Sequence, residues 1–396
     1  MSKHYSRAIS NIDDQIAGLG LVGDQRTAAV IDLNGSILWY CPGRFDRPSL
    51  FGRLLDQAAG SWHLIAERAR PLRRRYIDES GILETALRVD GHEWTVTDFM
   101  EIADGAPKGA LCRRFGHAPA EIRIEIQPRP NYNRDSVRFH RSGGAVVIND
   151  EWHLCASHPL HVADGTISFS LPTGEDGWAV LTDTRPASLS TACIDAWLDA
   201  TLARWKELSD TGGYRGPYRR EVLESLRALR LLHHRATGGI IAAATSSLPE
   251  TIGGSANWDY RYVWLRDASM IVSALVRAGV SLNEGERYLD FICSSLGSSP
   301  RYPLAVLTTL DHERAPDTTT LPLSGYQCSA PVRAGNSARD QIQLDGYANV
   351  LLSAKLVYER RQDRPHWKTI ARIADFLVTH WTEPDHGIWE EPVTRH

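Results

Sequence analysis

Residues 257–268, Asn-Trp-Asp-Tyr-Arg-Tyr-Val-Trp-Leu-Arg-Asp-Ala, combine the side-chain types that a carbohydrate pocket requires. The segment holds four aromatic rings, two arginines and two aspartates. Aromatic rings stack on the flat apolar faces of sugars, and guanidinium and carboxylate groups form directed hydrogen bonds to hydroxyls. The same composition also fits an aromatic helix start with a local ion pair between Arg266 and Asp267. The segment alone therefore leaves a sugar pocket and a structural role open.

The segment from Asn257 to Asp267 resembles the substrate-pocket motif of glycoside hydrolase family 15, which contains the glucoamylases and the bacterial trehalases. Three further segments resemble the same family in the same order, namely residues 243–250, 325–345 and 387–391. Residues 20–51 resemble the domain that precedes the catalytic barrel in trehalase-like members. The resemblance implies inverting hydrolysis of a non-reducing α-linked glucose, in a malto-oligosaccharide, an isomalto-oligosaccharide or trehalose.

By this resemblance, Glu390 is the general acid of the reaction. Cleavage of an acetal requires a proton at the leaving oxygen and a second carboxylate on the opposite face of the sugar, roughly 6.5–9.5 Å away in inverting enzymes. Trp389 would supply the apolar wall that keeps a carboxyl protonated near neutral pH. The charge of Glu391 would raise the pKa of Glu390 further if both side chains faced one site. The alternative for the two glutamates is a solvated loop end.

The resemblance also implies roles for the other polar and aromatic residues. Arg266 would donate hydrogen bonds to the outer hydroxyls of the glucose, and Asp267 would accept them. The next wall would be the loop 326–345, and every polar residue in it could equally be structural. Besides Arg266 and Asp267, the candidate substrate-binding residues are Trp258, Tyr260, Trp264, Arg333, Asn336, Asp345, Trp389 and Glu391, with one or two of the three earlier aromatic residues expected in the core.

The position of Glu390 near the last residue, His396, conflicts with the family pattern. In the family the acid lies near the middle of an (α/α)6 barrel, and the general base comes much later in the chain. We therefore expect an incomplete barrel, severely reduced turnover, and exposed apolar helix faces that favour a homo-oligomer or a partner chain. Glu250 is expected to be structural rather than a substitute base. The alternative function is a catalytically silent carbohydrate-binding or interaction protein.

The composition argues against several classes of protein. Lys and Arg total 44 against 48 Asp and Glu, a net charge of −4 that does not favour nucleic acid or an anionic membrane as partner. No apolar run approaches the roughly 18 residues of a membrane helix, and the first residues show no signal peptide, so we expect a cytoplasmic protein. The six cysteines lack metal-ligand spacing, and the adjacent His233 and His234 would point apart on a helix. We expect neither a metal nor a cofactor.

Residues 1–187 predict an antiparallel β-sandwich. Asn34-Gly35 and Asp90-Gly91 each separate two β-prone runs, as in two-residue hairpin turns. Residues 121–126 alternate strictly between charged and apolar side chains, which is typical of a half-buried strand. The polar clusters 23–27 and 44–49 either face the pocket or are turn and interface residues.

The pattern becomes helical after this region. Residues 188–217 predict a linker helix with apolar side chains at helical spacing, and residues 218–396 predict the partial (α/α)6 glycoside hydrolase domain. The expected fold class is therefore multi-domain, β followed by α. Helices are expected at residues 222–233, 269–278, 284–296, 341–359 and 366–381.

Overall fold

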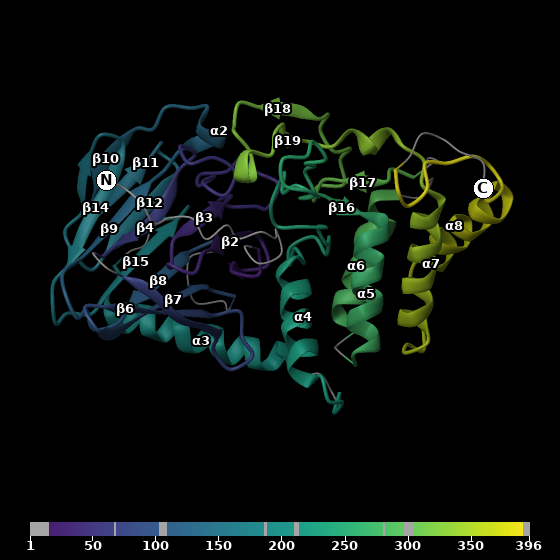
Figure 1. The fold of residues 1–396 in the computed structure, drawn as a ribbon. Helices are drawn as coiled ribbons and strands as arrows, with labels where there is room; N and C mark the ends of the chain where they lie inside the picture. Colours follow the sequence, from purple (N-terminus) through teal and green to yellow (C-terminus); the bar gives the residue numbers. More distant parts are fainter. Residues whose placement is uncertain are drawn as a thin grey trace.

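The computed structural model describes residues 16–66, 69–102, 109–185, 188–209, 214–279, 282–296 and 304–390. Antiparallel sheets form the N-terminal region, and most helices follow in the C-terminal region. Figure 1 shows the sheets on one side of the molecule and the helices α5 to α8 on the other. This arrangement confirms the expected order of β followed by α.

The first sheet has seven strands whose neighbours all pair antiparallel. On β9 the three isoleucines are buried while Arg123 is exposed, as the alternation in the sequence predicts. In order across the sheet, the strands are β1 (Gly20–Gly23), β2 (Ala28–Ile31), β3 (Ile37–Tyr40), β4 (Ser61–Ile65), β9 (Ile122–Gln127), β14 (Thr166–Leu171) and β13 (His161–Ala163).

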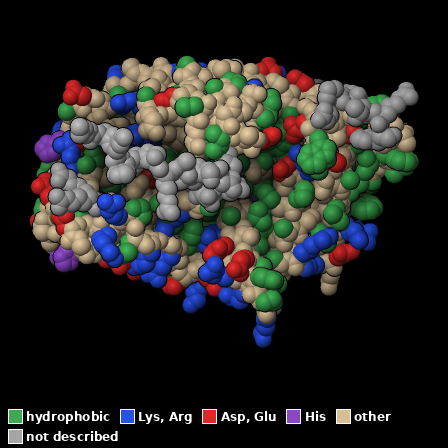
Figure 2. Space-filling view, viewed as in Figure 1, with side chains coloured by type: hydrophobic (Ala, Val, Ile, Leu, Met, Phe, Trp, Pro, Cys, Tyr) green, Lys and Arg blue, Asp and Glu red, His purple; other side chains and the backbone are tan. Residues whose placement is uncertain are grey.

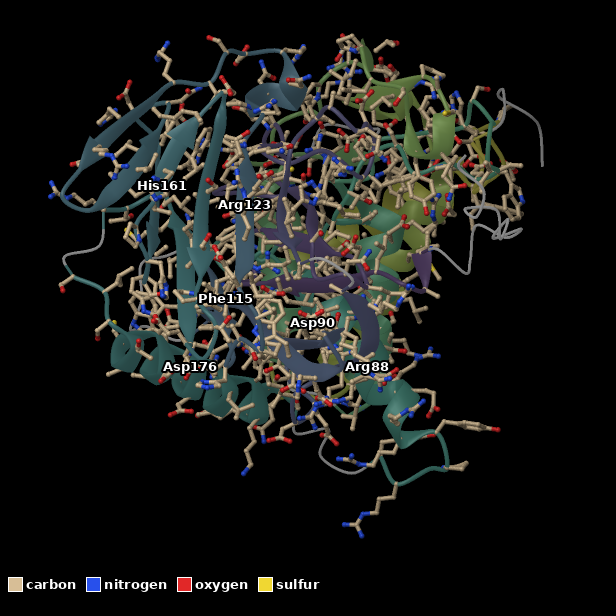
Figure 3. The ribbon with its side chains drawn as sticks, turned by 60° about the vertical axis from the view of Figure 1, so that its left-hand side comes forward. Arg88, Asp90, Phe115, Arg123, His161 and Asp176 are labelled. Carbon is tan, nitrogen blue, oxygen red and sulfur yellow. The ribbon has the colours of Figure 1, made fainter. Side chains whose placement is uncertain are left out.

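The second sheet has eight strands and packs against the first. Buried side chains of both sheets, including Trp62 and Ile124 of the first and Trp94 and Leu111 of the second, form one hydrophobic cluster. Figure 3 labels Phe115 on β8 and Arg123 on β9, one residue from each sheet. In order, the strands are β10 (Phe139–Ser142), β11 (Ala145–Ile148), β12 (Trp152–Ala156), β15 (Gly177–Thr182), β8 (Leu111–Phe115), β7 (His92–Met100), β6 (Leu83–Val89) and β5 (Arg70–Tyr76).

Only one of the two predicted hairpin turns takes the expected form. Asp90 and Gly91 both have positive φ, 46° and 85°, and join β6 to β7 directly. Between β2 and β3 the connection is longer, because Ile31 pairs with Ile37 and the loop covers residues 32–36. The Asp32 carboxylate closes this loop by accepting hydrogen bonds from the backbone N–H of Asn34 and Ser36, so a two-residue turn at Asn34-Gly35 was the wrong prediction.

Helix α3 (Thr191–Ser209) packs against the second sheet and is not a free linker. Its Trp197 and Trp205 are buried with Phe99 and Val180 of the sheet. Arg114 of β8 also bonds Asp195 of α3, and Figure 3 shows Asp176, a second partner of Arg114, beside this helix.

The remaining long helices are α4 (Arg219–Leu231), α5 (Leu265–Arg277), α6 (Asn283–Leu296), α7 (Leu344–Tyr358) and α8 (Trp367–His380). Residues of α5 to α8, among them Val272, Tyr347 and Ile373, share a second hydrophobic cluster. The incompleteness of the barrel stays a prediction.

The structure also contains short elements, of which α2 lies between β9 and β10 and the others lie between the long helices. They are α2 (Pro130–Asn133), β16 (Val263–Trp264), β17 (Leu307–Thr308), β18 (Thr319–Leu321), η1 (Tyr326–Cys328), β19 (Val332–Ala334) and η2 (Ser337–Asp340).

Apolar side chains remain exposed at the end of the molecule formed by α7 and α8, where Figure 2 shows them gathered. Val378 and Trp381 are 74% and 65% exposed. Within the described parts of the chain, no helix combines the length and apolar character needed to span a membrane. The cytoplasmic location and the self-association expected from the sequence stay predictions.

Candidate active site

A cavity of about 670 Å³ lies where several loops meet the start of α5. Its walls come from Ala242, Ala243 and Glu250, from the 258–267 segment, from residues 336–341 and from residues 388–390. Its volume is that of a pocket for a small ligand. Each of the four segments that resemble one family in sequence therefore contributes residues to this cavity.

The segment 257–261 is extended, and its side chains alternate between two environments. Ala243 and Ser247 donate backbone hydrogen bonds to the carbonyl oxygens of Tyr260 and Trp258, which hold the segment extended. Trp258 and Tyr260 face the cavity. Asn257, Asp259 and Arg261, at the alternate positions, are at most 1% exposed. This two-residue period places the aromatic walls of the cavity on one face and a buried polar face behind it.

Arg266, in the first turn of α5, lies among three carboxylates. Its guanidinium is 3.4 Å from Asp267 Oδ2, 3.7 Å from Asp345 Oδ2 and 3.6 Å from Glu390 Oε1. Its Nη1 also donates a hydrogen bond to Gln343 Oε1 at 3.0 Å. One cation thus holds together four side chains from three segments that are far apart in the sequence.

The surroundings of Glu390 raise the pKa of its carboxyl. Burial raises the pKa of Glu390 above its ordinary value of 4.5, and the charge of Asp267 adds to the rise, while Arg266 opposes it. Burial likewise raises the pKa of Asp267, again with Arg266 opposing. Because the net direction for Glu390 is upward, its carboxyl suits proton donation better than an exposed glutamate would.

Seven of the candidate residues line the cavity: Trp258, Tyr260, Arg266, Asp267, Asn336, Trp389 and Glu390. Trp389 is 83% exposed, at the outer end. Asn336 is 3% exposed, and its side chain accepts the N–H of Ala338 at the start of η2. Glu391 lies outside the described residues.

Three other candidates do not line the cavity. Trp264 is 1% exposed and packs in a small core cluster with Tyr262 and Leu307, so it is the core member of the aromatic group. The guanidinium of Arg333 lies 4.1 Å from the ring centroid of Trp258, so Arg333 supports a wall residue instead of facing the cavity itself. Asp345 lies near Arg266, with its Oδ2 3.7 Å from the guanidinium, but does not line the cavity. Both of its carboxylate oxygens are buried without a hydrogen-bond partner.

Glu250 is a charged lining residue that was not among the candidates from the sequence. It is exposed and forms part of the cavity wall, although a structural role was expected. Burial raises the pKa of Tyr260 to about 12, and the charges of Glu390 and Glu250 both add to this shift. Tyr260 therefore lies within electrostatic range of both glutamates. The signal in the sequence was that Glu250 ends one of the four family-like segments.

The described residues contain no group of three or more His, Cys, Asp and Glu side chains arranged to hold a metal ion. His233 and His234 are buried, which lowers their pKa values to about 3 and about 4. Both imidazoles are therefore neutral near pH 7. All six cysteines are free thiols.

Known proteins resemble this chain over most of its length. A trehalase of Mycolicibacterium smegmatis is 29% identical over 95% of the chain and 62% of its own length. Trehalase 1 of Sulfolobus acidocaldarius is 31% identical over 94% of the chain and 66% of its own length. The chain thus spans about 62–66% of the length of these relatives. A crystal structure of a bacterial glucoamylase complexed with acarbose superposes with a TM-score of 0.62 and 10% identity, over 95% of this chain and 60% of the other, which shows similarity of fold.

The chain thus combines an antiparallel β region, a following helical region, and a cavity walled by aromatic rings, one arginine and carboxyl groups. Residues 10–194 match the trehalase-like N-terminal domain, and residues 216–396 match the glycosyl hydrolases family 15. The helical region therefore belongs to glycosyl hydrolase family 15, and the β region to the trehalase-like N-terminal domain family.

Proposed function

We propose that the cavity binds a non-reducing-end α-linked glucose and that the protein hydrolyses this linkage with inversion. Trehalose is the first substrate to test, because the relatives of this chain carry the name trehalase. The observation that carries the proposal is the approach of Arg266 and Glu390 to 3.6 Å inside a cavity with two aromatic walls. If Arg266 and Glu390 had been on opposite sides of the molecule, the sugar-binding group and the proton donor could not have shared one site.

Five of the residues that line the cavity have a role in this mechanism. Trp258 and Tyr260 offer ring faces to the sugar. Arg266 donates hydrogen bonds to hydroxyls, and the Asp267 carboxylate accepts them. Glu390 delivers its proton to the glycosidic oxygen as the bond to the anomeric carbon breaks. Water adds to that carbon from the opposite face as the bond breaks, and it releases one of its protons to bulk water.

The activation of that water is the demanding step for residues 1–396. Within the described part of the chain, the other carboxyl groups lining the cavity are those of Asp267, which pairs with Arg266, and of the exposed Glu250. We assign the general base to neither of them. We therefore propose slow turnover, because no carboxyl group among the described lining residues is assigned as general base, and a general acid acting alone retains only part of the rate enhancement.

Release of glucose from trehalose, maltose and isomaltose tests the hydrolysis directly. Lactose, a β-linked disaccharide, serves as the control substrate. Glucose release from an α-linked substrate that is lost in Glu390→Gln supports the proposal. Binding of these sugars without release of glucose in prolonged incubation contradicts it.

Sugar binding without cleavage is the second candidate function. The observation in its favour is again the proximity of Arg266, because a nearby cation stabilises the carboxylate form of Glu390 that has no proton to donate. Calorimetric titration with trehalose separates this function from hydrolysis. The silent protein would bind the disaccharide with the same stoichiometry and leave it intact.

The organisation of the chain is part of the same proposal. We place a β domain at residues 1–187, a connecting helical segment at 188–217 and a catalytic domain at 218–396. The exposed apolar residues of α8 support the proposal that a second copy or a partner chain covers this face. A cytoplasmic location is proposed with it.

A further inference from the structure

The guanidinium of Arg261 joins the β region to the segment that carries the aromatic walls. The side chain is 1% exposed and points away from the cavity, on the face opposite Trp258 and Tyr260. Its Nε and Nη2 donate to the two carboxylate oxygens of Asp259 at 2.8 and 2.7 Å. Nη2 also donates to the hydroxyl of Tyr132 at 2.7 Å, and Nη1 donates to the carbonyl oxygen of Arg47 at 2.8 Å.

Two aromatic rings of the β region hold the same guanidinium from its sides. The ring centroids of Trp39, on β3, and of Tyr132 each lie 5.6 Å from the guanidinium carbon. The indole N–H of Trp39 also donates to the carbonyl oxygen of Ala244 at 3.1 Å, next to the cavity residue Ala243. A buried guanidinium with this many fixed partners has few alternative positions.

Asp259 also forms hydrogen bonds to the loop whose residues 336–338 line the cavity. Its Oδ2 accepts the backbone N–H of Gly335 at 3.1 Å, and its carbonyl oxygen accepts the side-chain amide of Asn336 at 3.1 Å. Asn336 in turn caps η2 by accepting the N–H of Ala338 at 2.9 Å. Asn336 and Ala338 both line the cavity. A continuous series of hydrogen bonds therefore runs from Tyr132 through Arg261 and Asp259 to the cavity wall.

We propose that Arg261 is a positioning residue through which the β region fixes the cavity wall formed by residues 335–338. The role does not require contact between Arg261 and the ligand. Loss of one acceptor leaves a buried N–H unpaired and lets the guanidinium shift, and Asp259 shifts with it. The consequence for sugar binding rests on the proposed function, whereas the effect on the wall does not.

The variant Tyr132→Phe tests the proposal, because it removes only the hydroxyl that Arg261 bonds. The matched control is Tyr76→Phe on β5. The Tyr76 ring carries a guanidinium too, that of Arg227 at 3.5 Å, and its hydroxyl donates to the carbonyl oxygen of Leu21 at 3.0 Å. This site lies away from the cavity lining. Arg261→Lys is the second variant, because a lysine keeps the charge but not the planar fork.

Hydrogen exchange of the Gly335 and Ala338 amides reports on the wall without any ligand. We expect Tyr132→Phe to speed this exchange about fivefold, the effect of roughly one hydrogen bond, and Arg261→Lys to speed it more. Tyr76→Phe should leave it unchanged. Equal exchange in wild type and both test variants, or the same acceleration in the control, overturns the proposal. Should Arg261→Lys fail to fold, the comparison of the two tyrosine variants still decides.

Trehalose affinity supplies the second measurement, with the melting temperature of each variant recorded beside it. We expect Tyr132→Phe to weaken binding about fivefold, at a melting temperature similar to that of Tyr76→Phe, which should bind as wild type does. If wild type binds none of trehalose, maltose and isomaltose, the proposed function fails, while the exchange experiment still decides the role of Arg261. If the Gly335 and Ala338 amides exchange more slowly in Tyr132→Phe than in wild type and trehalose affinity is unchanged, the positioning role is contradicted.

Discussion

Replacing Glu390 with glutamine separates proton donation from sugar binding. Glutamine keeps the size of the side chain but cannot deliver a proton, and loss of a general acid slows catalysis about 10²–10⁴-fold. That factor corresponds to about 3–5 kcal/mol on the barrier. The ion pair with Arg266 is long, at 3.6 Å, and the Glu390 side chain is 26% exposed, so its loss should change KM less than about fivefold. We therefore expect kcat to fall and KM to change little.

Two α-glucoside substrates sharpen this test. A 4-nitrophenyl glucoside has a leaving group that departs with little protonation, so it depends less on the acid than trehalose does. We expect Glu390→Gln to lose much more activity on trehalose than on the aryl glucoside, as measured by release of glucose and of nitrophenol. Equal losses on both substrates would refute the assignment of Glu390 as proton donor and point to a structural defect.

The raised pKa of Glu390 also predicts the pH dependence. Only the protonated carboxyl donates, so the rate should fall as pH rises through a value above 4.5, and Glu390→Gln should lose that limb. A carboxyl whose pKa is higher in the folded than in the unfolded protein stabilises the folded state below the unfolded pKa. This contribution disappears as pH rises through the folded pKa. The melting temperature of Glu390→Gln relative to wild type should therefore be higher at about pH 7 than at about pH 4. The same difference between the two proteins at both pH values would contradict a raised pKa of Glu390.

Two further substitutions test the cavity walls. Arg333→Ala removes the cation stacked 4.1 Å from the Trp258 ring centroid, together with hydrogen bonds to the carbonyl oxygens of Ser255 and Asn257. We expect it to weaken trehalose binding about three- to tenfold by calorimetry, since a cation over an indole contributes about 0.5–2 kcal/mol, and unchanged affinity would show that Trp258 needs no support. Glu250→Gln should weaken binding of trehalose more than binding of glucose, by about tenfold or more, as expected for one charged hydrogen bond to the second sugar. Equal effects on both ligands would place Glu250 at the first sugar instead.

Several elements of the fold follow from short-range patterns in the sequence. Residues 121–126 alternate so strictly that one face had to be buried, and β9 occupies residues 122–127. The helix expected at residues 269–278 is the later part of α5, and the one expected at 284–296 corresponds to α6. In each case the apolar period by itself selects the element type.

The cavity could be predicted only in part, because its geometry depends on contacts between distant residues. Tyr260 and Trp264 look alike in the sequence, yet the first faces the cavity and the second is buried. The chain is extended as far as β16 and turns helical at Leu265, so no single period relates the two rings. Arg333 was expected to contact sugar, but its partner is an indole 75 positions earlier in the chain, a pairing that only the folded molecule creates. The roles of these residues in binding and catalysis stay predictions.

The opposed faces of residues 257–261 make this stretch sensitive to length. An insertion or deletion of one residue would exchange the two faces, turning the indole and phenol toward the β region and driving Asp259 and Arg261 into the ligand space. A point substitution changes only one of the two faces, whereas an insertion or deletion of one residue disrupts both. Ser246 forms an antiparallel β-bridge with Asp259. Loop grafting or directed evolution on this scaffold should therefore keep the number of residues between Ser246 and the first turn of α5, and vary chain length elsewhere.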